Sequence, residues 1–230
     1  MSWKSNFVSL YYDGAPEPAD PVLTHSDTAL LVIDVQNTYL ERPDRATLSA
    51  DDRRRYDLWT PFHARMHGQV IPRTARLLAE FRARKMECLF ARIACHTKDG
   101  RDRSLSQKLP GWNNLLLHKS GQPSQLVPEL APVGDEIVVT KTTDSALTGT
   151  NLRLILANLG VKTVVCAGIF TDQCVSSTVR SLADESFGVI VAEDCCAAAS
   201  DALHSQELAS INRIYCSVMS GAELTAYLPG

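Results

Sequence analysis

The sequence predicts an α/β fold, a doubly wound, mainly parallel six-stranded sheet with helices on both faces. Two observations predict it. Five short apolar runs lack the in–out alternation of half-exposed strands, and helix-period segments separate them; the runs cover residues 29–34, 87–93, 136–140, 163–167 and 189–192. Strands without alternation are buried on both faces, as in parallel sheets. Their alternation with helices favours right-handed crossovers within one sheet.

The segments between the runs carry the helical period. Apolar residues recur three or four positions apart within residues 70–81, 152–159 and 175–182. Gly160 directly follows the second of these segments, where a glycine commonly ends a helix. A weaker apolar run predicts the sixth strand near residues 214–218.

We expect one domain, residues 28–230, preceded by an N-terminal arm, residues 1–27. The arm is polar and contains prolines, but it also has five large apolar or amphipathic side chains. They are Trp3, Phe7, Leu10, Tyr11 and Tyr12. Side chains of this kind favour burial, and aromatics are common at interfaces. The arm therefore predicts a homo-oligomer, a dimer or tetramer, and folding of the arm onto its own subunit is the alternative.

The composition argues against several classes of function. The formal net charge is -3 and basic residues are spread along the chain, so we expect no nucleic-acid partner. The densest basic run, residues 53–55, is interpreted as a solvated helix face, with an anion site as the alternative. The longest apolar run, residues 29–33, is too short to cross a membrane, and residues 1–10 lack a secretory pattern. Seven cysteines, mostly within apolar runs, indicate buried free thiols and a cytoplasmic protein.

Three reactive side chains follow three of the predicted strands. Asp34 ends the first apolar run, Lys141 follows the third, and Cys174 follows the fourth after a short loop and opens a helix. The carboxyl ends of parallel strands meet at one edge of the sheet, where such folds bind their ligands. Taken alone, each side chain has a common structural role: a turn acid, a solvated lysine, a small core residue.

Together the three types make a nucleophile. A thiol attacks as thiolate, and a helix N-terminus and a nearby ammonium group both favour that form. Asp34 is placed to take the thiol proton and to deliver it to a leaving amine. Backbone amides of the loop from Gly168 to Cys174 are suited to hold an oxyanion.

Three blocks resemble the isochorismatase-like cysteine hydrolases, which have a Rossmann-like α/β fold. They are ALLVIDVQN at residues 29–37, VVTKTTDSALTGTNL at residues 138–152 and AGIFTDQCVSST at residues 167–178. Their order and spacing agree with the family, and the resemblance runs from about residue 29 to residue 198. It implies a hydrolase that acts on C–N bonds other than peptide bonds.

The resemblance also implies roles for single residues. Asp34 becomes the general base, Cys174 the nucleophile and Lys141 the electrostatic partner of both. The family has a non-proline cis peptide before the nucleophile, which corresponds to Ile169–Phe170 here. This geometry directs the amides of Phe170 and Cys174 toward one oxyanion.

The departures from the family bear on substrate and cofactor. Members that lack the cysteine cleave the vinyl ether of isochorismate, so Cys174 favours an amide or ureido substrate. Metal-dependent nicotinamidases have an acid and two histidines after the second strand, where this chain has only His96. His63 and His67 share a helix face but lack a third ligand. We therefore expect no metal and no organic cofactor; a metal-dependent nicotinamidase-type amidase and a catalytically idle assembly subunit remain the alternatives.

Five further residues are candidates for binding the small-molecule substrate. Asn37, Tyr39 and Arg42 follow Asp34, and Arg42 could pair with a substrate carboxylate. Trp112 lies in a loop that could close over the site, and Gln173 precedes the nucleophile. The alternatives are a surface role for Arg42 and core or interface packing for Trp112.

Overall fold

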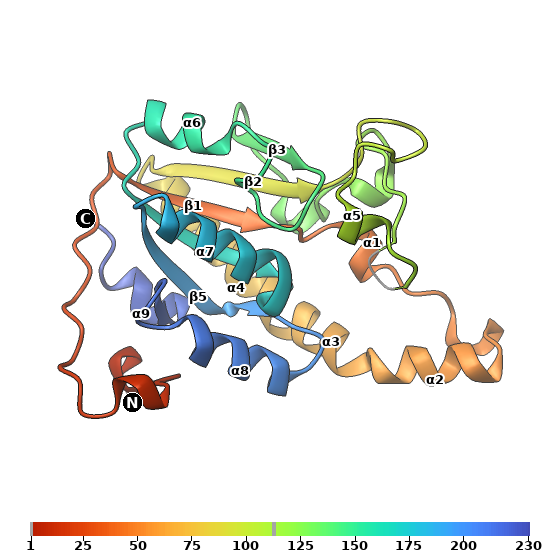
Figure 1. Ribbon diagram of the computed structural model, residues 1–230, viewed down its shortest axis with the longest axis horizontal. Coiled ribbons are helices and arrows are strands. Elements are labelled where there is room, and N and C mark those ends of the chain that lie inside the picture. The colour runs from red at the N-terminus through yellow and green to blue at the C-terminus, as the bar shows by residue number, and fades with distance from the viewer. Residues whose placement is uncertain (1, 112–113) are drawn as a thin grey trace.

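Six strands pair side by side in the computed structural model, which describes residues 2–111 and 114–230 (Figure 1). The strands are β1 Thr28–Ile33, β2 Glu87–Ile93, β3 Ile137–Lys141, β4 Thr163–Ile169, β5 Gly188–Ala197 and β6 Ser217–Met219. Their order is β3-β2-β1-β4-β5-β6, and every pairing is parallel. The predicted fold class is confirmed.

The sixth strand lies further along the chain than predicted. Ile214 is exposed, and Arg213 has a left-handed φ of 70°. The amide of Arg213 donates to the carbonyl of Cys216 at 2.8 Å, so a tight turn occupies the first part of the apolar run. The chain becomes extended only from Ser217 onward.

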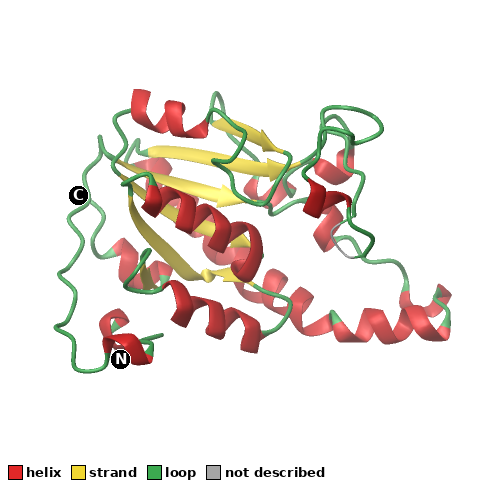
Figure 2. Ribbon diagram, viewed as in Figure 1, coloured by secondary structure: helices red, strands yellow, loops and turns green. Residues whose placement is uncertain are grey.

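Nine helices accompany the sheet in the described residues. They are α1 Asn37–Leu40, α2 Ala50–Leu58, α3 Thr60–Arg65, α4 Ile71–Ala83, α5 Leu105–Lys108, α6 Leu152–Asn158, α7 Ser176–Asp184, α8 Asp201–Ile211 and α9 Gly221–Thr225. Helices α6, α7 and α8 cover one face, and α3, α4 and α9 cover the other (Figures 1 and 2). Two π-helical turns, η4 Met66–Val70 and η7 Thr171–Val175, run directly into α4 and α7. No helix among the described residues is long and apolar enough to cross a membrane.

Burial on both faces explains why β1 is an unbroken apolar run. All six of its residues are buried. Leu30 and Val32 pack into the core under α4 and α9, whereas Leu31 and Ile33 pack into the core under α7 and α8. A polar residue at either set of positions would face a packed layer, so the alternation of a half-exposed strand is absent.

β1 is also the point at which the sheet reverses direction. It pairs with β2 on one side and with β4 on the other. The chain winds outward through β2 and β3 and then returns to β4 beside β1. In such sheets the crevice at the carboxyl ends of the two central strands is the usual ligand site.

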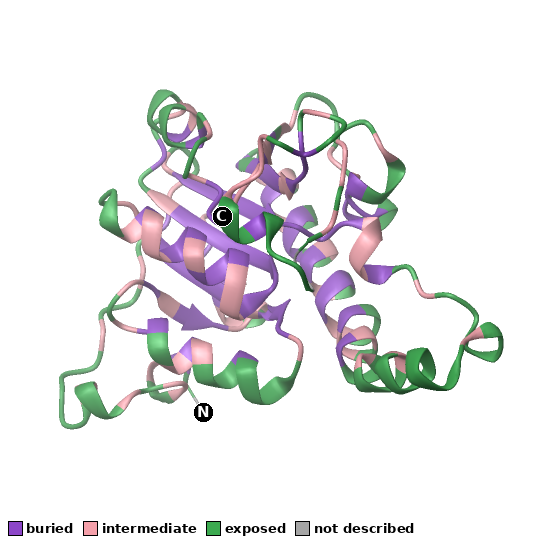
Figure 3. Cartoon of the chain, turned by 45° about the vertical axis from the view of Figure 1, so that its right-hand side comes forward, coloured by how far each residue is buried: buried purple, intermediate pink, exposed green. Residues whose placement is uncertain are grey.

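Helix α2 extends away from the rest of the fold on the side of the strands' carboxyl ends (Figures 1 and 3). None of its residues is buried, and the basic run at residues 53–55 is solvated. The Ser49 hydroxyl caps the helix by accepting from the Asp52 amide. Leu58, at its end, is 65% exposed.

The arm runs past the amino ends of the strands, far from that edge (Figure 1). Trp3 is buried, and its Nε1 donates to the Tyr227 hydroxyl at 3.2 Å. The Asn212 amide donates to the carbonyls of Asn6 and Phe7. The first residues of the arm thus fold onto their own subunit. Exposed apolar side chains follow them, which are Leu10 at 87%, Tyr11 at 94% and Val22 at 87%.

Candidate active site

Asp34, Lys141 and Cys174 converge at the carboxyl ends of the central strands. Asp34 comes directly after β1, Lys141 is the last residue of β3, and Cys174 lies in η7 after β4. All three side chains are buried, at 2%, 0% and 6% exposure. The structure therefore brings together the three reactive residues that the sequence places at strand ends.

The ammonium group of Lys141 crosses the end of β2 to reach Asp34. Because β2 lies between their strands, the two backbones are about 10 Å apart. Lys141 Nζ lies 2.6 Å from Asp34 Oδ2 and donates to the carbonyl of Thr143 at 3.1 Å. A long cationic side chain is needed at this position, since a shorter one would leave the buried carboxylate unpaired.

The backbone of Asp34 turns its carboxylate into the site. Its φ is 54°, in the left-handed region that residues other than glycine rarely adopt. Its amide still donates to the carbonyl of Ala91 at 2.9 Å, which fixes it to β2. Apart from the ion pair, neither carboxylate oxygen accepts a hydrogen bond of regular geometry from the described residues. A buried base in this state is free to take a proton.

Close packing at the end of β4 positions the loop that carries the nucleophile. Gly168 has a φ of 123°, and a Cβ there would lie 2.0 Å from the carbonyl oxygen of Ile33. No other residue type fits at this contact between β1 and β4. The peptide bond between Ile169 and Phe170 is cis, at the position that the family resemblance implies. The Phe170 carbonyl then accepts from the amides of Gln173 and Val175, which forms the π-helical turn.

Burial disfavours the thiolate of Cys174, an effect that acts against the helix start and the nearby lysine. Burial raises its pKa well above the ordinary value, and the charge of Lys141 only partly opposes this effect. Burial likewise raises the pKa of Asp34, against the charge of Lys141. The pKa of Lys141 is raised, because the attraction of Asp34 and Cys174 outweighs its burial. The thiol and the base thus have to exchange a proton at the moment of attack.

A second carboxylate, that of Asp144, lies beside the thiol and was not singled out from the sequence. Cys174 Sγ is 3.8 Å from Asp144 Oδ1, and the Gln107 amide donates to the same oxygen at 2.6 Å. Gln107 is buried in the short helix α5. Asp144 is three residues after Lys141 in a conspicuous polar block, which is the only signal the sequence gives. Its contact with Gln107 depends on how α5 folds back.

Gln36 links the ends of the strands. Its side-chain amide donates to the carbonyls of Ile93 and Ser124, at 3.0 and 2.8 Å, and its oxygen accepts from the Ile93 amide at 2.9 Å. These bonds join the end of β1 to the end of β2 and to the short 3-10 helix η5 Gln122–Ser124. Gln36 is fully buried, so it fixes the backbone next to Asp34.

The predicted substrate-binding residues have different environments. Tyr39 is half-buried, and its pKa is raised by burial and by the nearby charges of Asp34 and Cys174. Asn37 donates its side-chain amide to the Gln122 carbonyl at 3.0 Å. Gln173 lies in η7 beside the nucleophile. Trp112 lies outside the described residues.

Arg42 is held by the projecting helices. Its guanidinium carbon lies 3.3 Å from the centroid of the Tyr56 ring. The same group donates to the carbonyl of Tyr56 and to the hydroxyl of Thr60. These contacts fasten the loop after α1 to α2 and α3.

Aromatic rings surround Phe170. The ring of Tyr39 meets it edge-on at 5.5 Å, and Trp59 and Phe62 approach at 6.0 and 5.1 Å. The Tyr39 and Trp59 pairs are edge-to-face, a geometry worth about 0.5–1.5 kcal/mol per pair beyond burial. They fix the residue next to the nucleophile turn and form an apolar wall.

A small cavity lies near the carboxyl ends of β2 and β3. Its volume is about 10 Å³, and it borders Tyr39, Gln107 and Thr142. That is about the space of one water molecule. Arg103 donates to the carbonyls of Gln107 and Leu115, each at 2.9 Å.

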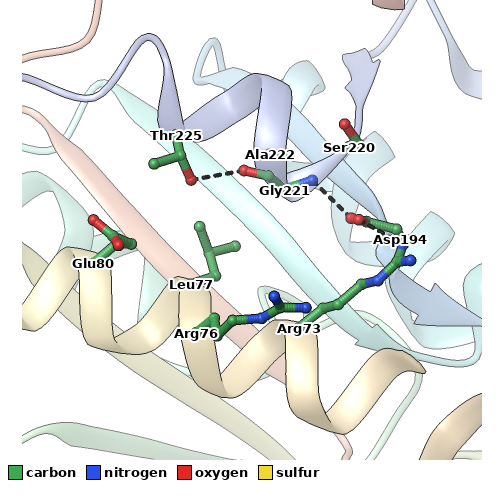
Figure 4. Close-up of a pocket in the computed structure, with 9 residues that line it drawn as sticks. All are labelled: Arg73, Arg76, Leu77, Glu80, Asp194, Ser220, Gly221, Ala222 and Thr225. Carbon is green, nitrogen blue, oxygen red and sulfur yellow. Dashed lines mark hydrogen bonds and ion pairs between the residues drawn. The ribbon is translucent and has the colours of Figure 1, made fainter. Parts of the chain in front are cut away.

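A larger pocket, of about 590 Å³, opens elsewhere, between α4 and α9 (Figure 4). Arg73 forms an ion pair with Asp194 at its edge, at 2.8 Å, and Asp194 also accepts from the Gly221 amide at 2.7 Å. None of the three reactive residues lines this pocket. The charged groups beside α9, Arg73 and Asp194, form an ion pair with each other.

The histidines that were considered as metal ligands do not gather around one point. His96 lies 3.4 Å from Lys119 Nζ, while His63 and His67 stack at 6.4 Å. Burial, with the charges of Arg42 and His67, lowers the pKa of His63 to about 4. Among the described residues, no three His, Cys, Asp or Glu side chains are arranged to hold a metal ion.

Comparison with known proteins adds a family to this geometry. Residues 28–223 match the sequence profile of the Isochorismatase domain. Ureidoacrylate amidohydrolase RutB of Methylobacterium radiotolerans is 30% identical over 214 residues, which cover 87% of this chain and 78% of that protein. The structure of a cysteine hydrolase from Pseudomonas syringae pv. phaseolicola matches with a TM-score of 0.75 at 21% identity, over 93% of this chain and 97% of that one. N-carbamoylsarcosine amidase from Thermoplasma acidophilum matches with a TM-score of 0.63 at 21% identity, over 85% and 96%.

Proposed function

The chain belongs to the isochorismatase family of hydrolases, and from this premise we propose that it is a cysteine-dependent amidohydrolase of small molecules. The bond cleaved is a C–N amide or ureido bond, and ammonia or an amine is released. The observation that carries the proposal is the meeting of Cys174, Asp34 and Lys141 in one buried site. The relatives named as ureidoacrylate amidohydrolases support the choice of a non-peptide C–N bond.

In the first half-reaction Asp34 takes the proton of Cys174 as the sulfur attacks the carbonyl carbon. Burial raises the pKa of both groups, so it disfavours the charged form of each. Lys141 stabilises the negative charge wherever it lies, on the carboxylate or on the sulfur. The protonated Asp34 then gives its proton to the leaving nitrogen, and the C–N bond breaks to leave a thioester on Cys174.

In the second half-reaction water cleaves the thioester. Asp34, again a carboxylate, removes a proton from the water as its oxygen attacks the thioester carbon. The C–S bond breaks, and the proton returns from Asp34 to the sulfur. The products are a carboxylic or carbamic acid and the free thiol. Each residue ends in its starting state, so the cycle needs no cofactor.

The negative charge on the substrate oxygen needs donors. We assign them to the backbone amides of Phe170, which directly precedes η7, and Cys174, which lies within it. Donors on a rigid turn are already oriented when the charge develops, and loss of one such donor typically costs about 2.7–4 kcal/mol of barrier. The aromatic contacts of Phe170 hold its amide in place.

Asp144 gives the site a preference for substrates with N–H groups. One of its oxygens lies 3.8 Å from the sulfur, and no hydrogen bond to the other is found among the described residues. A carboxylate there accepts from the NH₂ of an amide or ureido group and repels an anionic group at the same position. Ureido compounds, which present donors on both sides of the carbonyl, fit this arrangement.

The test is a screen of ureido and linear amide compounds for ammonia release by protein that has been treated with a chelator. An active compound should also leave an adduct on the peptide that contains Cys174 when the reaction is quenched in acid and its mass measured. Activity that disappears on chelation and returns with a metal ion would replace the proposal with a metal-dependent amidase. No turnover, together with a Cys174 that reacts no faster than a model thiol, would favour a catalytically idle subunit.

A further inference from the structure

Helix α8 contacts both ends of the turn that carries the nucleophile. Thr171 is the first residue of η7, and Ser176 follows its last residue. The Thr171 hydroxyl lies 2.8 Å from His204 Nδ1, and the Ser176 hydroxyl donates to Glu207. His204 and Glu207 are three residues apart and therefore lie on one face of α8.

These contacts are buried, so they are not interchangeable with water. Thr171 is 0% exposed, Ser176 3% and His204 3%. Glu207 also forms an ion pair with Arg180 of α7 at 2.7 Å. A buried hydroxyl that loses its partner costs about 1–3 kcal/mol, so the turn is strongly held where it is.

Arg65 determines which nitrogen of His204 carries the proton. Arg65 Nη2 lies 2.9 Å from His204 Nε2, and a guanidinium group can only donate. Nε2 therefore accepts, and the N–H of the ring is on Nδ1. Nδ1–H then donates to the Thr171 hydroxyl. The nearest carboxylate, Glu193, is 3.8 Å from Nε2, too far to take a proton from it in a hydrogen bond.

Arg65 is itself held in place from three sides. Its Nε donates to the carbonyl of Cys196 at 3.1 Å, and its Nη1 pairs with Asp201 at the start of α8 at 3.3 Å. Its Nη2 lies 4.0 Å from Glu193. The end of α3, the end of β5 and the start of α8 are thus joined at this one side chain.

We propose that α8 is the positioning element of the nucleophile, in which His204, fixed as the Nδ1–H tautomer by Arg65, and Glu207 hold the two ends of the turn around Cys174. The inference rests on the proposed role of Cys174. Because the sulfur has to pass its proton to Asp34, a small displacement of the turn reduces the rate. A misplacement of the order of 1 Å can cost about a hundredfold. His204 and Glu207 are positioning residues and do not touch the substrate.

Two pairs of variants test the His204–Thr171 bond. Thr171→Val removes the hydroxyl and keeps the volume, whereas Thr171→Ser keeps the hydroxyl. His204→Asn retains an N–H donor near the position of Nδ1, and His204→Gln instead retains an acceptor near the position of Nε2. We expect Thr171→Val and His204→Gln to lower kcat about tenfold or more with little change in KM. The kcat of Thr171→Ser and of His204→Asn should stay closer to the kcat of the parent protein.

Leu208→Val is the matched control, because Leu208 is fully buried on α8 and belongs to no polar contact described above. It should lower Tm, since a buried methylene is lost, and leave kcat unchanged. The positioning role is wrong if kcat falls in proportion to Tm across all the variants, Leu208→Val included. It is also wrong if His204→Asn and His204→Gln are equally impaired.

Alkylation of Cys174 by iodoacetamide separates this inference from the proposed function, because it needs no substrate. The pH profile of the alkylation rate should shift in Thr171→Val and stay in place in Leu208→Val. If the profile shifts but the protein hydrolyses no amide, the positioning role is supported and the proposed function is wrong. If the profile does not shift in Thr171→Val, the positioning role is wrong, whatever the turnover of the variant. Nitrogen NMR should find the proton of His204 on Nδ1, and a proton on Nε2 would exclude the part assigned to Arg65.

Discussion

Lys141 and Asp34 form a fully buried ion pair, 2.6 Å apart, across a strand that lies between them. Burial raises the pKa of Asp34, and the charge of Lys141 acts in the opposite direction. Burial also raises the pKa of Cys174, again against the charge of Lys141. The site is therefore set up for a proton transfer, and the predictions below test each member of it.

Replacing Cys174 by Ala should abolish turnover and leave the fold intact. The proposed covalent step takes place on the sulfur of Cys174, so we expect a loss of more than about a hundredfold, or ~2.7 kcal/mol of barrier. Turnover and Tm are measured together. Cys216→Ala, which removes a buried thiol away from the site, should keep its turnover. If the Cys174→Ala protein keeps more than a hundredth of the parent rate, Cys174 is not the nucleophile.

Lys141→Met should slow the alkylation of Cys174 at neutral pH. The charge of Lys141 lowers the pKa of this thiol, so its removal raises the pKa and reduces the thiolate at any given pH. The measured profile of alkylation rate against pH should move to higher pH. Lys162→Met is the control, since Lys162 is 80% exposed at the amino end of β4. A profile that stays in place in Lys141→Met would contradict the electrostatic role.

Asp144→Asn should have the opposite effect on the same measurement. The charge of Asp144 raises the pKa of Cys174, and the amide removes that charge while keeping the shape. Alkylation at neutral pH should therefore become faster, and the profile should move to lower pH. For an uncharged ureido substrate KM should rise, because one N–H acceptor is weakened. The exposed Asp135 offers a control, Asp135→Asn, which should change neither quantity.

Asp34→Asn should lose turnover and the acid limb of its pH profile. In the parent, kcat/KM falls as pH drops through the pKa of Asp34, because a protonated carboxyl group cannot take the thiol proton. Burial raises that pKa, so the limb should lie above the range of an ordinary aspartate. Substrate binding, measured by calorimetry, should persist in the variant. Normal turnover in Asp34→Asn would rule out the general-base role.

The arm should contribute to a homo-oligomer through Leu10 and Tyr11, which are 87% and 94% exposed in the single chain. Leu10→Ser with Tyr11→Ser should lower the mass measured by light scattering and leave the stability of the subunit nearly unchanged, since neither side chain is buried within it. Trp3→Ala should instead lower Tm, because Trp3 is buried against its own subunit. A parent protein that is already monomeric at micromolar concentration contradicts the prediction.

The sequence by itself determined the sheet and the places where chemistry could occur. Unbroken apolar runs indicate strands that are buried on both faces, and this pattern is typical of parallel strands covered by helices. Asp34, Lys141 and Cys174 follow such runs, and parallel strands end at one edge whatever the side chains do there. The position of these residues is therefore a property of the chain order. The sixth strand was placed too early, because the turn at Arg213 and Cys216 depends on a hydrogen bond that no local pattern announces.

Only the tertiary structure decided how the site works. The distance from Lys141 to Asp34, the second carboxylate of Asp144 and the contact between His204 and Thr171 join residues 30 to about 107 positions apart. Such contacts depend on strand order and helix packing, so the spacing of residues in the sequence does not predict them. The direction of the pKa shift of Cys174 is decided in the same way. A helix start and a nearby lysine favour a lower pKa, but burial of the side chain raises it, and burial is known only once the chain has folded.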